Sequence, residues 1–413
     1  SNEHTLIVNG EIYNHLQLRS KLTNYPFTTS GDSEVILALH EQYLANSHKS
    51  PSASDHASWL EQLDGMYAIA LWDGLNQQLI LARDSLGIKP LVKTEVEGTL
   101  LFASEVKALR ADERHIPELD EVALAARMVW EYPLDATTLL KGVTQVRPGT
   151  VETWELNDEG EAFMSGRATI RRQIVDPGTS WNPMTQGPIL LDSFVSSVQQ
   201  RLMADVPVGI VLSGGLDSSL VAAVAQEAAS RAEQPVPECW TVAESEDNPD
   251  WKAAELVASH FDLHHHQHIL EPDAFERALP NLIWHGEDID VTVLFFQPLF
   301  ETMAKKVKVG LCGQGADELH AGYPRYRDLP QHAHLLRQRL QSLPSTVQNS
   351  LENGPLTEEE GWFSPHQRPE EQTKDLSTFL QFELDHGQLS NFQLRLVDRH
   401  SMAHSLEVRV PFL

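Results

Sequence analysis

The chain has 413 residues, of which 41% are hydrophobic, and a formal net charge of −28. This length predicts roughly two or three domains with a sizeable core. The strong negative charge argues against an extended electrostatic contact with nucleic acid or with an anionic membrane, and no apolar run is long enough to cross a bilayer. Two cysteines, Cys239 and Cys312, are too few for a disulfide framework, so we expect a cytoplasmic protein.

The first part of the chain, to about residue 155, is predicted to be rich in strands. A short apolar strand over 5–8 is expected to end at Asn9-Gly10. Strands over 66–72 and 79–81 are separated by Asp73-Gly74, which is a hairpin signal. A further strand is expected over 100–103. The polar stretch that follows, up to residue 190, contains several prolines and glycines and is predicted to be a linker.

From Leu191 the pattern changes to alternating helices and strands. An amphipathic helix is expected over 191–202, followed by strands over 208–211, 238–242 and 307–311 with helical patterns between them. This alternation predicts a parallel sheet with helices on both faces, in which ligands bind beyond the carboxyl ends of the strands. From Leu335 onward helical patterns dominate.

The run Leu212–Ser219 places a glycine turn between a buried strand and the start of a helix. Such a turn presents backbone N–H groups and the positive end of the helix dipole to an anion. Gly214 and Gly215 allow a close approach of the backbone to a ligand, and Asp217 could hold a divalent cation. The alternative is an ordinary glycine turn, but the whole octet resembles the pyrophosphate-binding loop of the ATP pyrophosphatases.

A second glycine turn with carboxylates lies at Leu311–Glu318, again after a predicted strand. If both turns leave the same sheet, Asp217 and Asp317 could hold Mg²⁺ between them, because Mg²⁺ prefers a few carboxylates together with phosphate oxygens. The alternative is that Asp317 only caps the helix that follows.

Two further stretches occur in the first part of the chain. The amide of Asn9 and the N–H of Gly10 could form an oxyanion hole, and Glu11 and Asp32 could neutralise a substrate ammonium, although Asn-Gly is often only a turn. The charged residues of 83–91 and 102–107 are better explained as structural pairs and turns than as catalysts.

Five motifs together resemble the glutamine-hydrolysing asparagine synthetases, and they occur in the family's order. They are NGEIYN from Asn9, RDSLGIKPL from Arg83, SGGLDSS from Ser213, GQGADE from Gly313 and SLEVRVPFL from Ser405. The resemblance implies an α+β glutaminase domain of the N-terminal nucleophile hydrolase type over 1–160, a linker over 161–190, and an α/β parallel-sheet ATP-pyrophosphatase domain with extra helices over 191–413.

The resemblance also implies a reaction. Glutamine would supply ammonia, and MgATP would adenylate the side-chain carboxylate of aspartate with release of pyrophosphate, giving asparagine and AMP. Expected ligands are thus ATP, Mg²⁺, glutamine and aspartate; no nucleic acid or membrane partner is expected, and a homodimer is compatible with the family.

Site residues follow from the matched motifs. The resemblance implies an oxyanion hole of Asn9 and Gly10; glutamine binding by Asn9, Gly10, Glu11 and Asp32; ATP binding by Leu212, Ser213, Gly214, Gly215, Asp217, Ser218, Ser219, Val242, Cys312 and Gly313; Mg²⁺ binding by Asp217 and Asp317; and a catalytic position at Gln314.

The chain also departs from the family pattern. Because NGEIYN begins at Asn9, the first glutaminase strands and the nucleophilic cysteine are expected to be missing, and the chain as given is expected not to hydrolyse glutamine. It also ends at Leu413, before the family's last helices and catalytic lysine. Gln314 replaces a glutamate and cannot act as a general base. Leu294 and Phe295 stand where an arginine of the aspartate site is expected, which leaves the acid substrate open.

Three alternatives therefore remain. The chain could be a ligase that acts on another carboxylate, as β-lactam synthetases do, or a relative that has lost catalysis. A tRNA-modifying ATP pyrophosphatase is disfavoured by the glutaminase motifs and by the net charge. The histidines at 264–266 and His268 suggest a metal site, but structural or exposed histidines are the simpler interpretation.

Overall fold

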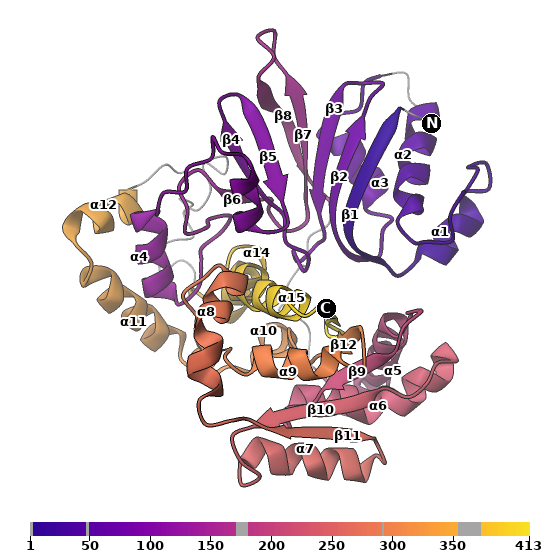
Figure 1. Ribbon diagram of the computed structural model, residues 1–413, viewed down its shortest axis with the longest axis vertical. Coiled ribbons are helices and arrows are strands. Elements are labelled where there is room, and N and C mark those ends of the chain that lie inside the picture. The colour runs from indigo at the N-terminus through magenta and orange to yellow at the C-terminus, as the bar shows by residue number, and fades with distance from the viewer. Residues whose placement is uncertain (1–2, 47–48, 171–180, 291–292, 354–372) are drawn as a thin grey trace. The chain divides into compact units, whose positions relative to one another are not determined.

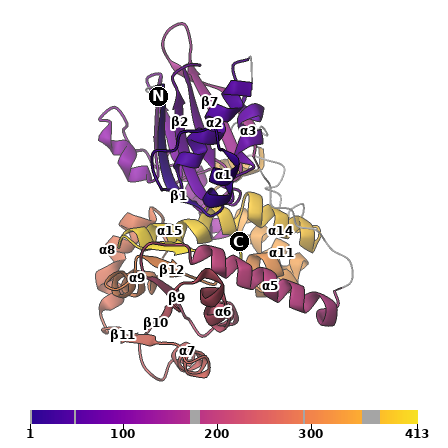
Figure 2. The same ribbon diagram turned by 90° about the vertical axis from the view of Figure 1, so that its right-hand side faces the viewer.

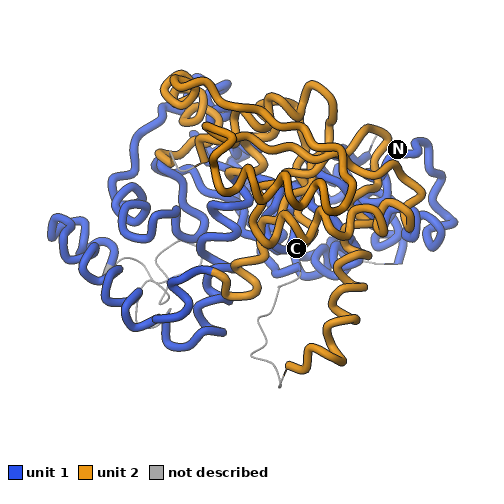
Figure 3. Tube along the Cα trace, turned by 90° about the horizontal axis from the view of Figure 1, so that it is seen from below, with its two compact units in different colours: residues 1–175, 323–395 blue, residues 176–322, 396–413 orange. Residues whose placement is uncertain are grey.

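The computed structural model describes residues 3–46, 49–170, 181–290, 293–353 and 373–413 (Figure 1). The chain divides into two compact units (Figure 3). Unit 1 comprises residues 1–175 and 323–395, and unit 2 comprises residues 176–322 and 396–413. Each unit is therefore built from two separate stretches of the chain.

Unit 1 contains a five-stranded antiparallel sheet, and the predicted strands over 5–8, 66–72 and 79–81 are confirmed as parts of it. The hairpin at Asp73-Gly74 is also present, because β2 pairs directly with β3. In spatial order the strands are β1 (His4–Ile12), β2 (Gly65–Asp73), β3 (Gln78–Arg83), β7 (Thr150–Leu156) and β8 (Ala162–Thr169).

The expectation that the first strand ends at Asn9-Gly10 is wrong. β1 continues to Ile12, with Asn9 opposite Ala68 and Gly10 opposite Tyr67 on β2. Gly10 has a φ of +149°, and a Cβ at this position would lie 2.0 Å from the carbonyl oxygen of Met66. The glycine here therefore permits a close approach of two strands within the sheet and does not form a turn.

Both faces of this sheet are covered. Helices α1 (His15–Lys21), α2 (Glu34–Asn46) and α3 (Ala53–Leu60) lie along one face (Figure 2). There Ile36 and Leu39 of α2 pack with Ile69 and Leu71 of β2 in one core. The other face packs against a small antiparallel sheet through a second apolar cluster. The small sheet contains β4 (Val92–Val96), β5 (Thr99–Ala103) and β6 (Thr144–Gln145).

The ordered structure extends into the segment predicted as a linker, 161–190. β8 pairs with β7 on both sides of a bulge at Ser165, and α5 begins at Pro183 with Asn182 as its cap. Residues 171–180 lie outside the described part of the chain. The pattern of prolines and glycines did not reveal β8, because its pairing partner lies across a turn and its side chains are mostly half-exposed.

The rest of unit 1 is helical, as expected for the region after Leu335. Arg339 donates to the carbonyl oxygen of Val129 at 2.9 Å, and Asp135 accepts from His386 at 3.0 Å, so the later helices are tied to the segment around α4. The helices of unit 1 are α4 (Glu121–Trp130), α11 (Leu329–Gln341), α12 (Ser345–Asn353) and α14 (Leu376–Asp385), and short turns of 3-10 or π helix span Val106–Ala111, Pro324–Arg327 and Leu389–Gln393. Helix α15 (Leu394–Met402) begins in unit 1 but belongs mostly to unit 2, which resumes at residue 396.

Unit 2 is built on a five-stranded parallel sheet, which confirms the parallel sheet predicted from the alternating pattern. Its spatial order is β11 (His265–Ile269), β10 (Glu238–Ala243), β9 (Val208–Val211), β12 (Val309–Leu311) and β13 (Glu407–Arg409). The strand β13 was not predicted; its position depends on pairing with β12 about 100 residues earlier in the chain.

Apart from α15, six helices of the described part of the chain accompany this sheet. The core of unit 2 joins α5, α6 and α7 to β9 and β10 through small and aliphatic side chains, such as Val221, Ala225 and Ile210. The helices are α5 (Pro183–Arg201), α6 (Leu216–Ala232), α7 (Pro249–His260), α8 (Ala274–Gly286), α9 (Phe296–Ala304) and α10 (Ala316–His320). Among the described residues, we find no helix with the length and apolar character needed to span a bilayer.

Candidate functional site

The two glycine loops of unit 2 lie side by side. β9 and β12 are neighbouring parallel strands, with Leu311 opposite Ile210, so the loops that follow them leave the same edge of the sheet. The backbone of Gly313 lies directly against the first turn of α6, because a Cβ there would be 2.7 Å from the amide nitrogen of Ser218 and 2.9 Å from the Cβ of Asp217. The structure therefore brings the two predicted loops together.

The first loop is closed by its own serines. The hydroxyl of Ser218 accepts from the amide of Ser213 at 3.1 Å and bonds to the Ser213 hydroxyl at 2.9 Å. Gly214 has a φ of +78°, and a Cβ there would lie 2.4 Å from the carbonyl oxygen of Asp250. At the start of α6, Gly215 provides no side-chain cap. The first N–H groups of this 17-residue helix are thus free of a capping side chain and suited to an anion.

Two carboxylates from the two loops influence one another electrostatically. Burial raises the pKa of Asp217, the negative charge of Asp317 raises it further, and His320 opposes the effect. A cation bound beside Asp217 would offset the negative charge that disfavours ionisation of this carboxylate. Gly322 packs closely on the second of them, since a Cβ there would be 1.8 Å from the Oδ1 of Asp317. Sequence reasoning missed both His320 and Gly322.

The residues expected to contact adenosine lie at the carboxyl ends of three neighbouring strands. Leu212 donates its amide to the carbonyl oxygen of Trp240 at 2.9 Å, and Cys312 donates to that of Arg409 at 3.1 Å. Val242 lies near the end of β10. Burial raises the pKa of the Cys239 and Cys312 thiols to about 12, so both are protonated and unsuited to act as nucleophiles. Gln314 lies half-buried in the turn before α10.

The segment 287–296, which the family resemblance links to the acid substrate, is only partly described. Val291 and Thr292 lie outside the described residues. Phe295 is 40% exposed and its ring packs edge-on against Phe275 at 5.0 Å. Nearby, the side-chain amide of Gln297 bonds to His400 at 2.8 Å and to His404 at 2.9 Å. This segment therefore presents an apolar side chain where a charged one was expected.

The second candidate site lies on β1 in unit 1. The side-chain amide of Asn9 donates to the hydroxyl of Ser104 at 3.3 Å, and Asp32 accepts from the amide of Ile12 at 2.7 Å. Asp32 is thus held at the end of the strand that carries Asn9, Gly10 and the half-buried Glu11. Ser104 was not predicted, although it belongs to the 102–107 stretch that the sequence had singled out.

The loop that precedes Asp32 is held by two charged residues that sequence reasoning also missed. Arg19 donates to the carbonyl oxygen of Thr29 at 3.0 Å, and its guanidinium lies 4.1 Å from the centre of the Phe27 ring. Burial disfavours ionisation of Glu34, but hydrogen bonds from Thr29 and Thr28 outweigh it and lower the pKa of Glu34 to about 2. Glu34 is therefore ionised at neutral pH and accepts hydrogen bonds from Thr28 and Thr29.

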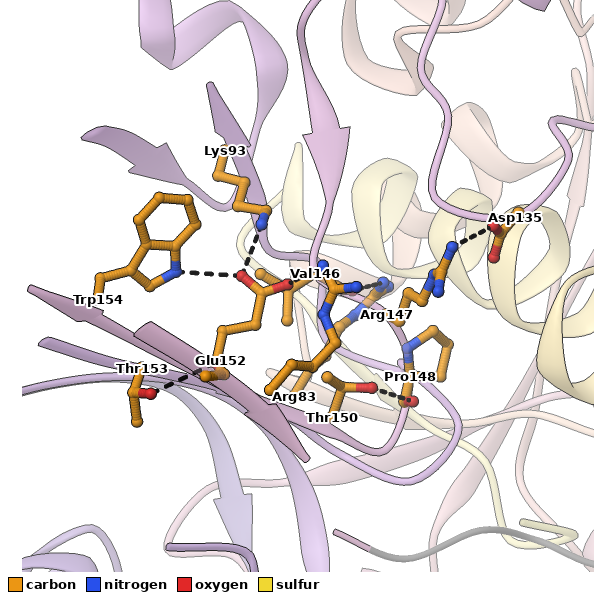
Figure 4. A network of polar contacts seen from close by, with 12 residues as sticks. Arg83, Lys93, Asp135, Val146, Arg147, Pro148, Thr150, Glu152, Thr153 and Trp154 are labelled. Carbon is orange, nitrogen blue, oxygen red and sulfur yellow. Dashed lines mark hydrogen bonds and ion pairs between the residues drawn. The ribbon is translucent and has the colours of Figure 1, made fainter. Parts of the chain in front are cut away.

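The charged motif from Arg83 is structural, as expected. The buried guanidinium of Arg83 donates to the carbonyl oxygens of Lys89 and Gly87 at 2.7 Å each. It also donates to that of Val146 at 2.9 Å (Figure 4). Close by, the carboxylate of Glu152 receives Lys93 at 2.6 Å and the indole N–H of Trp154 at 3.2 Å (Figure 4). These contacts connect the sheets of unit 1.

Comparison with known proteins identifies the family. Residues 190–413 match the family model described as asparagine synthase, and residues 1–163 match the glutamine amidotransferase domain. Since the first match alone spans more than half of the chain, the chain belongs to the asparagine synthase family.

Individual relatives agree. The chain is 31% identical over 328 residues to glutamine-hydrolysing asparagine synthetase 1 of Bacillus subtilis, covering 78% of this chain and 48% of the relative. It is 32% identical over 356 residues to asparagine synthetase B of Escherichia coli, covering 82% of this chain and 56% of the relative. A putative asparagine synthetase of Mycobacterium bovis is 30% identical over 459 residues, covering 99% of this chain and 67% of the relative. The chain thus spans about half the length of the first two.

Proposed function

We propose that the chain takes part in AMP-forming amide synthesis, in which ATP activates the side-chain carboxylate of aspartate and glutamine supplies the nitrogen. The observation that supports this most strongly is the contact between the two glycine loops at the carboxyl ends of β9 and β12. It gathers anion-binding N–H groups and two interacting carboxylates at one edge of the sheet, where ligands of parallel sheets bind.

In this proposal the first turn of α6 and the loop Ser213–Gly215 bind the β- and γ-phosphates of ATP through backbone N–H groups and the helix dipole. Asp217 and Asp317 would hold Mg²⁺, because a shared cation would offset the negative charge that Asp317 places beside Asp217. The bound ion would neutralise charge on the phosphates and the departing pyrophosphate. Leu212, Val242 and Cys312 would line the part of the site that holds the adenosine.

In the same proposal, the second candidate site, which lies on β1, binds glutamine. The Asn9 amide, oriented by Ser104, would stabilise an oxyanion together with the Gly10 N–H. Asp32, held by Ile12, and Glu11 would bind the substrate ammonium. In this assignment residues 1–160 form the glutaminase part, of the N-terminal nucleophile type, and residues 191–413 form the synthetase part.

The decisive experiment removes one carboxylate of the pair. Asp217→Asn should abolish pyrophosphate release from MgATP in the presence of aspartate and ammonia, measured with the full chain. Glu227→Gln is the matched control, because Glu227 lies on the same helix, is 60% exposed and pairs with Arg231 one turn further along the helix. Release at the wild-type rate by Asp217→Asn would exclude its proposed role.

A second candidate substrate is supported by the segment 293–297. Because Phe295 is apolar and partly exposed where a charged group was expected, a different carboxylic acid could take the place of aspartate. Pyrophosphate release measured with a panel of acids decides between the two: a response to aspartate alone supports asparagine synthesis, and a response only to another acid supports a related ligase.

A further inference from the structure

Unit 1 contains a buried cluster of two histidines and one aspartate that neither of the proposed sites uses. His4 begins β1 and stands directly opposite Asp73, the last residue of β2, in the antiparallel register. His40 reaches the same point from α2, which covers this face of the sheet. Their donor atoms lie within 4.8 Å of one another, and the three side chains are 3%, 0% and 0% exposed.

The hydrogen bonding of the cluster is incomplete. Both ring nitrogens of His40 and the Nδ1 of His4 are buried and make no well-formed hydrogen bond among the described residues, where His4 and His40 have only long contacts with the Asp73 carboxylate. A neighbouring histidine shows the usual arrangement: His56 accepts from the indole of Trp59 at 3.2 Å and bonds to Gln78 at 2.8 Å. Buried ring nitrogens without a partner are costly, so a group that satisfies those of His4 and His40 would stabilise the fold.

The distances within the cluster are long for hydrogen bonds and compatible with a shared metal ion. The Nδ1 of His4 lies 3.5 Å from the Oδ1 of Asp73, and the Nε2 of His40 lies 3.3 Å from its Oδ2. Hydrogen bonds of this type are shorter, about 2.7–3.2 Å. Two ligands of a tetrahedral zinc ion, each bonded at about 2.0–2.1 Å, are about 3.3 Å apart.

The carboxylate is also fixed in the way that metal-binding carboxylates are. Asp73 accepts from the amides of Leu75 and Asn76 at 3.0 and 3.1 Å and from the side chain of Asn76 at 2.7 Å. Such outer hydrogen bonds orient a ligand and leave lone pairs for the metal. These hydrogen bonds of Asp73 stabilise the turn after β2, but they do not account for the burial of the ring nitrogens of His4 and His40.

We propose that His4, His40 and Asp73 bind one divalent transition metal of the zinc class, with a structural role. Two imidazoles and a carboxylate are a ligand set that suits zinc. The ion would join the start of β1, the end of β2 and the middle of α2, and would thereby anchor the strand that carries Asn9 and Gly10. The inference does not depend on the proposed function, because it concerns other residues.

The test uses the full chain purified without a histidine tag. After loading with Zn²⁺ and passage over a chelating resin, elemental analysis should find about one zinc per chain, and Co²⁺ in its place should give the visible absorption of a tetrahedral site. Zn²⁺ should also raise the thermal unfolding temperature. His4→Gln and His40→Gln should each lose the retained zinc and the cobalt spectrum.

A matched control addresses the other candidate cluster. Glu238, His264 and His266 also lie close together, but His264 is exposed and Glu238 already bonds to His266 at 2.6 Å. The double variant His264→Gln, His266→Gln should retain the zinc. Loss of zinc in this control, retention of zinc in His4→Gln, or absence of stoichiometric zinc and of a cobalt spectrum in the wild type would each overturn the proposal. The last measurement needs no variant, so misfolding of a mutant cannot obscure the answer.

Discussion

The substitution Gly322→Ala tests the proposed Mg²⁺ site without changing any charge. A Cβ at residue 322 would lie 1.8 Å from the Oδ1 of Asp317 and 2.9 Å from its Cγ. Carbon and oxygen atoms that are not bonded normally stay about 3.3 Å apart, so the carboxylate oxygen must move by about 1.5 Å. The alanine thus displaces the carboxylate of Asp317, the proposed ligand, while Asp317 remains an aspartate with an unchanged charge.

The expected effect is large on activity and small on stability. A displacement of about 1 Å in a catalytic group can reduce the rate about 100-fold, so we expect a loss of this order in pyrophosphate release. Gly322 has no positive φ, and the two shortest contacts fall on the movable carboxylate of Asp317, while the third is with the Cα of Asp317 at 3.2 Å, where the backbone must give by a few tenths of an ångström. The free energy of unfolding should therefore change by less than about 1 kcal/mol.

The assay compares pyrophosphate release, the Mg²⁺ concentration for half-maximal rate, and urea unfolding for wild type, Gly322→Ala and Gly187→Ala. Gly187 is the control, because a Cβ there meets nothing within 4 Å. Wild-type release and Mg²⁺ dependence in Gly322→Ala would refute the assignment of Asp317 as a ligand. If Gly322→Ala lost activity only to the extent that the urea titration shows it to be unfolded, the claim that the substitution acts locally on Asp317 would be refuted.

Three other predictions follow from single features. Glu152→Gln leaves the buried ammonium of Lys93 without its counter-charge and should lower the free energy of unfolding by about 3–5 kcal/mol in urea titrations; a loss under about 1 kcal/mol would contradict this. Because burial raises the thiol pKa of Cys239 and Cys312 to about 12, neither should react with a thiol reagent at pH 8 until the chain is unfolded; rapid labelling of the native protein would show that they are accessible. Gln314→Glu should maintain or increase pyrophosphate release, whereas its collapse would mean that the amide itself is required.

Much of the fold and of the candidate sites could be predicted from the sequence, where the information is local. The strand, glycine turn and helix around Gly214 are encoded in adjacent residues, because only glycine tolerates that backbone and only a helix start leaves N–H groups free. The β–α alternation of the second half likewise indicated the parallel sheet, and hence which edge would hold the two loops. The motif order indicated the family.

Other features depend on contacts between residues distant in sequence. The Asn9-Gly10 pair has the local pattern of a turn, yet it lies within β1 because β2 continues alongside it to Gly65. The strand β13 forms only because β12 offers a free edge.

The buried cluster shows the same division. No sequence spacing relates His4, His40 and Asp73; the strand register places two of them opposite each other, and the packing of α2 adds the third. The sequence alone therefore determined the chemistry of the loops, because that chemistry belongs to consecutive residues. Only the tertiary structure decided which distant side chains meet, because burial and pairing bring them together irrespective of their separation along the chain.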